Sequence, residues 1–147
     1  SKEFVTMRRS LLALALSSLA LFAATPSQAQ VQVRISRASQ TMNVWVDGQL
    51  RHQWAVSTGR AGYGTPAGTY RPQRLAKRWY STKYNNAPMH NAVFFHGGYA
   101  IHGTSYVNDL GRPASHGCVR LDPYHAAEFY ELVRSHGAGR TRISITR

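Results

Sequence analysis

Cysteine is almost absent from this chain of 147 residues, because Cys118 is the only one. A single thiol excludes an internal disulfide framework, and it excludes every metal or redox motif built on a Cys-x-x-Cys pair. Internal repeats and low-complexity stretches are also missing from the sequence, which excludes a repeat array. A thiol with no partner in the chain is therefore a candidate for chemistry of its own.

Acidic residues are scarce: the chain has 6 Asp and Glu against 18 Lys and Arg, and its formal net charge is +12. Basic residues interleaved with aromatic ones are typical of nucleic-acid binding. Export of the chain, which its first residues predict, argues against a nucleic acid. We expect instead a basic face toward an anionic envelope polymer, or simple solvation. The basic cluster comprises Arg71, Arg74, Lys77, Arg78 and Lys83, interleaved with Trp79, Tyr80 and Tyr84.

No apolar run is long enough to span a bilayer, which takes about 20 residues. The longest run, Leu11–Ala24, follows the basic Met7-Arg8-Arg9 and precedes Ser27-Gln28-Ala29, whose small residues suit a signal peptidase. This order predicts a signal peptide over residues 7–29, with no permanent membrane anchor after cleavage. Residues 1–6 precede the first methionine and are interpreted as a cloning remnant. We expect an exported protein of the periplasm or cell envelope, by either the Sec or the twin-arginine route.

Residues 30–147 suffice for a single domain with a core of its own. Alternating apolar and polar residues predict half-buried strands, and Asp47-Gly48 predicts a tight hairpin turn between two of them. Residues 59–68, rich in glycine, predict an ordered loop. The predicted strands are Val31–Ser36, Met42–Val46, Gln49–Ser57, Ala92–Phe95, Tyr99–His102 and Thr141–Thr146.

A single helix is predicted, over residues 122–136. Asp122 suits its N-cap, Pro123 its first helical position, and Gly137 its end. The apolar residues at helical spacing are Ala126, Phe129, Tyr130 and Val133, which we expect to face the core. The sequence therefore predicts a mostly β domain with one main helix.

The thiol lies in Ser115-His116-Gly117-Cys118-Val119-Arg120-Leu121. An ordinary thiol has a pKa of about 8.5, so attack on a peptide carbonyl needs a base or a positive environment. His102, at the end of a predicted strand, is the candidate base, and a thiolate–imidazolium pair would activate the nucleophile. Because acidic residues are sparse nearby, we expect a backbone carbonyl to orient His102. Gly117 permits a sharp turn that aims successive N–H groups at a developing oxyanion.

Other interpretations compete with a nucleophilic cysteine. A zinc site drawn from His96, His102, His116 and Cys118 fits no standard ligand spacing, so we expect neither a metal nor a cofactor. An inert buried thiol is the common fate of an isolated cysteine. A non-catalytic envelope-binding module and a cysteine peptidase of different specificity are the remaining alternatives.

Two spaced motifs carry a resemblance to a known family. Ile101-His102-Gly103, followed by the segment Ser115–Leu121, closely resembles the signature of the L,D-transpeptidase catalytic domain of bacterial cell walls. Thr65-Pro66-Ala67-Gly68 and the stretch leading from Pro88-Met89 to the histidine are similar to further segments of that family. The resemblance covers most of residues 31–147, and it implies a β-sandwich of mixed sheets with one main helix.

The resemblance also implies roles for individual residues. Cys118 would be the nucleophile, His102 the general base and the Gly103 carbonyl its orienting group. His116 would support the thiol, beside the backbone turn at Gly117. The expected substrate-binding residues are Arg120, Ser115, Met89 and Tyr84.

A reaction follows from the same resemblance. The donor would be a peptidoglycan tetrapeptide stem, whose third residue is a diamino acid and whose fourth is D-alanine. Cys118 would attack the carbonyl of the third residue, release D-alanine and form a thioester. The acyl group would pass to the amine of a second stem, giving a 3-3 cross-link, or to an amine of an envelope protein. Transfer to water, which is L,D-carboxypeptidase activity, is the alternative.

Overall fold

The computed structural model describes residues 20, 21 and 29–147. The predicted signal peptide and the N-terminal remnant therefore lie outside the described residues, apart from three isolated positions. None of the helices within the described ranges combines the length and the apolar character that crossing a membrane requires.

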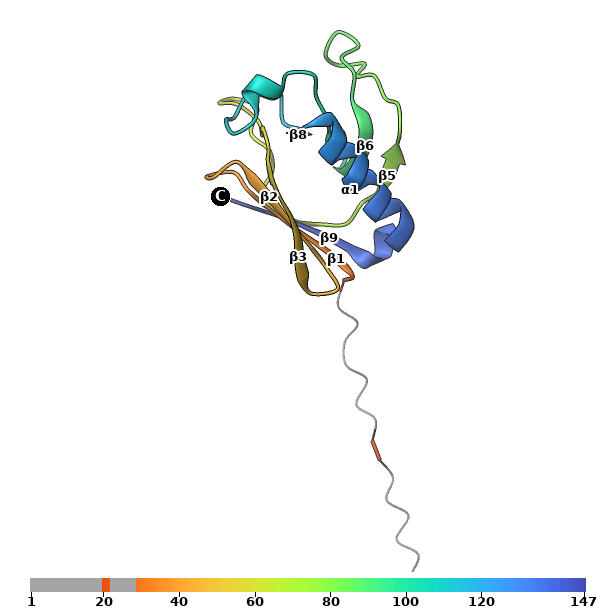
Figure 1. Cartoon of the computed structure of the whole chain (residues 1–147). Helices are drawn as coiled ribbons and strands as arrows, with labels where there is room; N and C mark the ends of the chain where they lie inside the picture. The colour runs from red at the N-terminus through yellow and green to blue at the C-terminus, as the bar shows by residue number, and fades with distance from the viewer. Residues whose placement is uncertain (1–19, 22–28) are drawn as a thin grey trace, which may run out of the picture.

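The described part of the chain is mostly β, with one main helix (Figure 1). The elements are β1 (Val31–Ser36), β2 (Thr41–Val46), β3 (Gln49–Ala55), β4 (Gly68–Tyr70), β5 (Arg74–Ala76), β6 (His90–His96), β7 (Tyr99–Gly103), the 3₁₀ helix η1 (Val107–Asp109), β8 (Val119–Leu121), α1 (Pro123–His136), the 3₁₀ helix η2 (Ala138–Arg140) and β9 (Thr141–Thr146).

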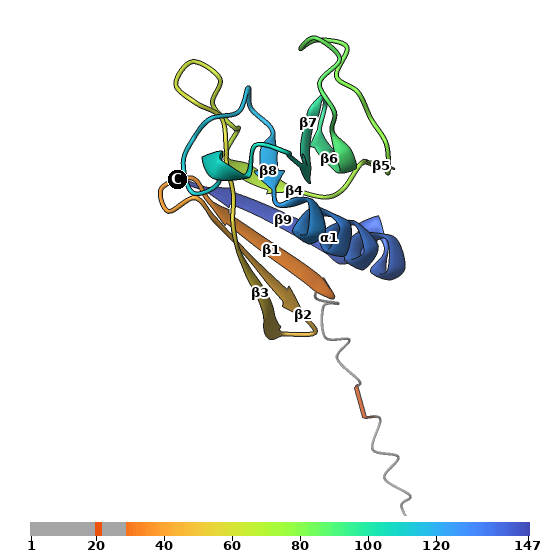
Figure 2. The same ribbon diagram turned by 45° about the horizontal axis from the view of Figure 1, so that its top comes forward.

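The strands form two mixed sheets. A five-stranded sheet has the order β3-β2-β1-β9-β4, and a four-stranded sheet has the order β5-β6-β7-β8. In the first sheet β1 is antiparallel to β2 and parallel to β9; in the second, β7 is antiparallel to β6 and parallel to β8. Figure 2 shows the two sheets with α1 beside them. The predicted fold class is thus confirmed.

The apolar residues that alternate in the sequence form the buried face of the five-stranded sheet. Val31, Val33 and Ile35 of β1 are buried, and Met42, Val44 and Val46 of β2 face the same interior. Both residues of the hairpin turn Asp47-Gly48 have positive φ, 50° and 79°, as a tight two-residue turn requires. The same cluster takes in buried residues of β7 and β8, so one core supports both sheets.

Helix α1 begins and ends as predicted. The carboxylate of Asp122 accepts a hydrogen bond from the Tyr124 backbone N–H at 2.9 Å, and Pro123 occupies the first position. Ala126, Phe129 and Val133 are buried, and the helix packs mainly on β6 and β7. Gly137 ends the helix with a φ of 98°. The helix therefore braces the two strands that lead to His102.

Three strands were not predicted: β4, β5 and β8, each of 3 residues. A strand of that length offers too few positions for an alternation to be recognised. The expected strand Gln49–Ser57 instead ends at Ala55, and Ser57 forms an isolated bridge with Arg120. That bridge connects the end of the hairpin to the segment that carries the cysteine.

Candidate active site

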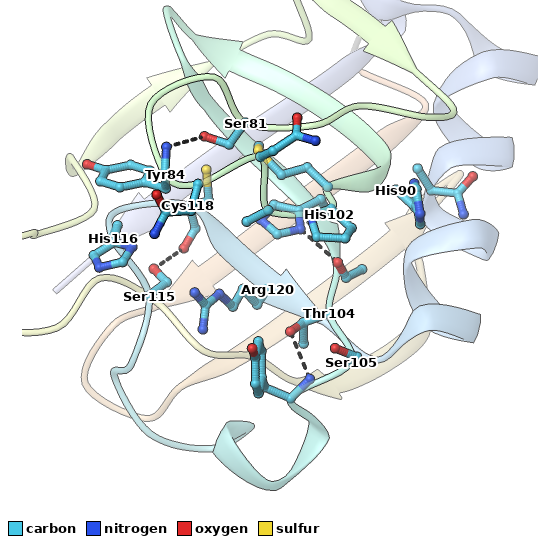
Figure 3. A pocket seen from close by; sticks show the side chains of 18 of the residues that line it. Ser81, Tyr84, His90, His102, Thr104, Ser105, Ser115, His116, Cys118 and Arg120 are labelled. Atoms are coloured by element: carbon cyan, nitrogen blue, oxygen red, sulfur yellow. Dashed lines mark hydrogen bonds between the residues drawn. The ribbon is translucent and has the colours of Figure 1, made fainter.

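The parallel pairing of β7 with β8 brings the two motifs together. In this register His102 is the partner of Arg120, and Ile101 is the partner of Val119. Cys118 directly precedes β8, so it lies beside β7 close to His102 (Figure 3). Both side chains line one cavity of about 840 Å³.

His102 is a buried imidazole held by its neighbour in the chain. Its Nδ1 lies 2.8 Å from the Gly103 carbonyl oxygen, and its side chain is nearly inaccessible, at 5% exposure. Because a carbonyl only accepts hydrogen bonds, Nδ1 donates, and Nε2 of the neutral ring is left as an acceptor. The hydrogen bond expected between His102 and Gly103 is therefore present in the structure.

The electrostatics of the pair favour uncharged groups at rest. Burial lowers the pKa of His102 to about 4, with smaller contributions from Arg120 and His90, against the opposing effect of the Gly103 carbonyl. Burial also raises the pKa of the Cys118 thiol, although a hydrogen bond from the Ala100 backbone and the charge of Arg120 act in the other direction. Both shifts favour a neutral thiol beside a neutral imidazole over the thiolate–imidazolium pair expected from the sequence.

Ser115 supports the loop that carries Cys118. Its hydroxyl donates to the Cys118 carbonyl oxygen at 2.6 Å and accepts from the Gly117 N–H at 3.0 Å. The side chain is fully buried at the cavity wall. These bonds favour a structural role for Ser115, and its contact with a substrate stays a prediction.

Gly117 adopts a conformation that a side chain would strain. Its φ is 123°, and a Cβ atom would lie 2.6 Å from Cε1 of Tyr99. The turn expected at this residue is therefore present, but its own N–H is bound to Ser115. The expected oxyanion hole would have to use other amides of the loop, and His116 and Cys118 supply the ones on either side.

Thr65 connects the glycine-rich loop to the loop that carries Cys118. Its hydroxyl donates to the Gly117 carbonyl oxygen at 2.8 Å and accepts from the Gly59 N–H at 2.9 Å. Thr65 is buried, at 1% exposure. The sequence marked Thr65 through its Thr-Pro motif but gave it no role, because its partner lies 52 residues away.

Replacing Thr65 by valine tests this connection. Valine has nearly the same shape but leaves the Gly117 carbonyl and the Gly59 N–H without a partner, so we expect the free energy of unfolding to fall by about 1–3 kcal/mol. Denaturant unfolding of Thr65→Val measures the loss, and Thr65→Ser, which keeps the hydroxyl, is the matched control. Equal stability of the valine variant and the native chain would contradict the assignment.

His116 joins three loops at the mouth of the cavity. Its ring stacks on Tyr84, with centroids 4.3 Å apart, and meets Tyr63 edge-on at 4.8 Å. A guanidinium nitrogen of Arg60 lies 3.1 Å from its Nε2, so that nitrogen accepts and the ring is neutral. Consistently, desolvation and the charges of Arg60 and Arg120 lower the pKa of His116.

The other predicted binding residues lie on the cavity wall. Arg120 lines the cavity, and its backbone exchanges hydrogen bonds with Ser57 at 2.9 and 3.0 Å. Met89 is buried and belongs to the small cluster against which Cys118 packs. Tyr84 lines the cavity from the loop opposite. The structure thus gathers every sequence-predicted site residue except Gly117 along this cavity, and Gly117 directly precedes Cys118 in the same loop.

Within residues 20, 21 and 29–147, no group of three or more His, Cys, Asp or Glu side chains is arranged to hold a metal ion. What the described residues provide is a thiol, an imidazole with a free acceptor nitrogen, and a nearby guanidinium. Such a set can attack a carbonyl group and protonate its leaving group.

Comparison with solved structures shows the same fold. An L,D-transpeptidase from Mycobacterium smegmatis is 22% identical, with a TM-score of 0.72, and the match covers 81% of this chain and 59% of that one. L,D-transpeptidase 3 from Mycobacterium tuberculosis, in complex with a faropenem-derived adduct, is 20% identical with a TM-score of 0.68, and the match covers 80% of this chain and 60% of that one. An L,D-transpeptidase from Stackebrandtia nassauensis is 23% identical with a TM-score of 0.71, and the match covers 88% of this chain and 62% of that one. The chain thus spans about three fifths of the length of these proteins.

Comparison with curated proteins gave no match. The profile of the L,D-transpeptidase catalytic domain (YkuD) matches residues 30–145, which include both sheets, the helix and the cavity. The chain belongs to the L,D-transpeptidase catalytic domain family.

Proposed function

We propose that the protein is an L,D-transpeptidase that acts on the stem peptides of peptidoglycan, with Cys118 as its nucleophile. One observation carries the proposal: Cys118 directly precedes Val119, the β8 residue that pairs with Ile101, so it lies beside the part of β7 that leads to His102, and both residues line the same cavity. The bond from His102 Nδ1 to the Gly103 carbonyl leaves Nε2 as the proton acceptor. Family membership supports this chemistry over an inert thiol.

The acylation step follows from the neutral resting pair. As Sγ of Cys118 attacks the carbonyl carbon of the third residue, Nε2 of His102 accepts the thiol proton. The C–S bond forms and the carbonyl oxygen becomes an oxyanion, which the loop amides and the positive charge of Arg120 stabilise. When the intermediate collapses, the C–N bond to D-alanine breaks and the imidazolium protonates its nitrogen. A thioester remains on Cys118.

Transfer reverses these proton movements. The amine of an acceptor attacks the thioester carbonyl, the C–S bond breaks, and the proton lost by the amine passes through His102 to the sulfur. A second stem gives a 3-3 cross-link, and an amine of an envelope protein gives an anchored protein. We propose that this occurs in the periplasm or cell envelope, where peptidoglycan lies.

Incubation with disaccharide-tetrapeptide tests the proposed function. We expect loss of D-alanine together with a cross-linked dimer, both detected by mass spectrometry. Loss of D-alanine without dimer would identify an L,D-carboxypeptidase. Cleavage at any other bond would identify a peptidase of different specificity, and no cleavage would favour a non-catalytic module.

The dependence of the reaction on pH tests the state of His102. Because the pKa of His102 is lowered from 6.5 to about 4, the base stays unprotonated until the pH falls well below 6. We expect kcat/KM for D-alanine release to fall with decreasing pH, with a midpoint nearer 4 than 6.5. Circular dichroism at each pH separates protonation from unfolding. A midpoint at 6.5 or above, in folded protein, would contradict a neutral buried imidazole.

A further inference from the structure

The structure separates four of the five basic residues of the cluster into two pairs. The guanidinium of Arg74 lies over the rings of Trp79 and Phe94, at 4.4 and 4.1 Å, and the ammonium of Lys83 lies 5.4 Å from the ring of Tyr84. These cations are held against aromatic faces. Lys77 and Arg78 are different, because they are exposed and line a second cavity.

The second cavity is suited to an anion. It has a volume of about 350 Å³ and is lined by Lys77, Arg78, Tyr80, His90 and Asn91. Two of these residues are cations, none is a carboxylate, and the others carry a hydroxyl, an imidazole and an amide. Such groups bind a carboxylate through charge-assisted hydrogen bonds.

Glu131, the carboxylate whose pKa Lys77 influences, already forms an ion pair with another residue. Lys77 makes the smallest contribution to the lowered pKa of Glu131, whose main cause is the hydrogen bond from Arg134. The Arg134 guanidinium donates to Oε2 of Glu131 at 2.8 and 2.9 Å and to Oε1 at 3.1 Å. Glu131 therefore leaves the charge of Lys77 available to a ligand.

The two cavities share a wall, formed by His90 and Asn91. The register of β6 against β7 shifts between His90 and Val93, and Asn91 has a φ of 50°. The Asn91 N–H donates to the Lys77 carbonyl oxygen at 2.8 Å, which joins this irregular segment to the basic one. A ligand of peptide length can therefore lie across the shared wall, with one end in each cavity.

The shared wall lies on the side of the general base. His90 pairs with Gly103, the residue after His102. Figure 3 shows His90 beyond His102 as seen from Cys118, whereas Tyr84 and His116 lie on the far side of the thiol. An attacking amine has to give its proton to His102, so a ligand that carries this amine approaches from the side of His90.

Resting on the proposed function, we propose that the second cavity binds a carboxylate of the acceptor stem. The acceptor presents its side-chain amine beside His102, and its backbone crosses the wall of His90 and Asn91. A stem carboxylate then meets Lys77 and Arg78. The cavity thus raises the share of the thioester that passes to a stem amine and lowers the share that passes to water.

The double variant Lys77→Gln/Arg78→Gln tests the proposal. With tetrapeptide donor and a tripeptide stem as acceptor at subsaturating concentration, the measured quantity is the ratio of dimer to hydrolysed product. We expect this ratio to fall about 3- to 10-fold, the size of effect that exposed charge pairs produce. The control is Arg140→Gln/Arg142→Gln, which removes the same charge from exposed residues that line neither cavity, and its ratio should match the native one.

A second arm changes the ligand instead of the protein. An acceptor whose stem carboxylates are amidated should lower the ratio in the native enzyme and have little effect in the double variant. An unchanged ratio in the double variant would overturn the proposal, as would an equal fall in the control. A native enzyme that releases D-alanine but never forms dimer also overturns it, while leaving the chemistry at Cys118 intact. A native enzyme that releases no D-alanine would instead refute the proposed function itself.

Discussion

Replacing Cys118 by alanine is expected to reduce D-alanine release by about 10⁴-fold or more, because the attacking atom is removed and no other side chain can form the acyl intermediate. Cys118 is the only cysteine in the chain, so no second thiol can substitute for it. The rate of D-alanine release from disaccharide-tetrapeptide, measured by mass spectrometry, gives the loss directly.

The serine variant separates the chemistry of the sulfur from its shape. Cys118→Ser keeps the size of the side chain, and we expect a comparable loss because a neutral imidazole does not readily deprotonate a hydroxyl, which is far less acidic than a thiol. Both variants should unfold close to the native midpoint, since Cys118 is only partly buried. An alanine variant that keeps more than a few per cent of native activity would rule out Cys118 as the nucleophile.

Replacing His102 by glutamine is expected to lower kcat/KM by about 10²–10⁴-fold, the usual contribution of a general base. Glutamine is polar and similar in size, but it cannot take a proton from the thiol. Without Nε2 the neutral thiol persists, because burial holds the pKa of Cys118 above its ordinary value. We also expect the variant's activity to recover partly at high pH, where hydroxide makes the thiolate.

The control for His102→Gln is His136→Gln, the same change at the end of α1 and outside the cavity. It should leave kcat/KM within about twofold of the native value, as expected for a residue that contacts no reacting atom. If His102→Gln lowered activity less than tenfold, or if both variants lost activity equally, the role of His102 as the base would be wrong.

The sequence predicted the helix and the strands whose pattern of apolar residues extends over enough positions to be recognised. Strands β1, β2 and β9 match the predicted alternation, because burying one face of a strand requires an apolar residue at every second position. Helix α1 matches its predicted capping residues. The strand β8 has only Val119, Arg120 and Leu121 and is defined by its pairing with β7. Its existence depends on a contact between segments distant in the chain.

The same limit applies to the site. Cys118, His102 and Gly103 were recognised because their motifs are local, and the hydrogen bond from His102 to Gly103 joins adjacent residues. The bond from Thr65 to Gly117 joins residues 52 positions apart, so it became visible only in the fold.

The pKa shifts of Cys118 and His102 could not be predicted from the sequence for a different reason. A histidine near a cysteine was expected to form an ion pair, whereas burial lowers the pKa of His102 and raises that of Cys118. Desolvation depends on how completely the surrounding chain excludes water. The degree of desolvation depends on the packing around the whole cavity, so a single sequence motif does not predict it.

The most direct test of the account is the mass of the intact protein during its reaction with disaccharide-tetrapeptide. We predict a covalent adduct equal in mass to the donor minus D-alanine, located on Cys118 by peptide mapping and absent from Cys118→Ala. A carbapenem should occupy the same thiol and prevent the adduct from forming. The absence of any adduct from a native protein that releases D-alanine, or an adduct that persists in Cys118→Ala, would contradict a thioester at Cys118.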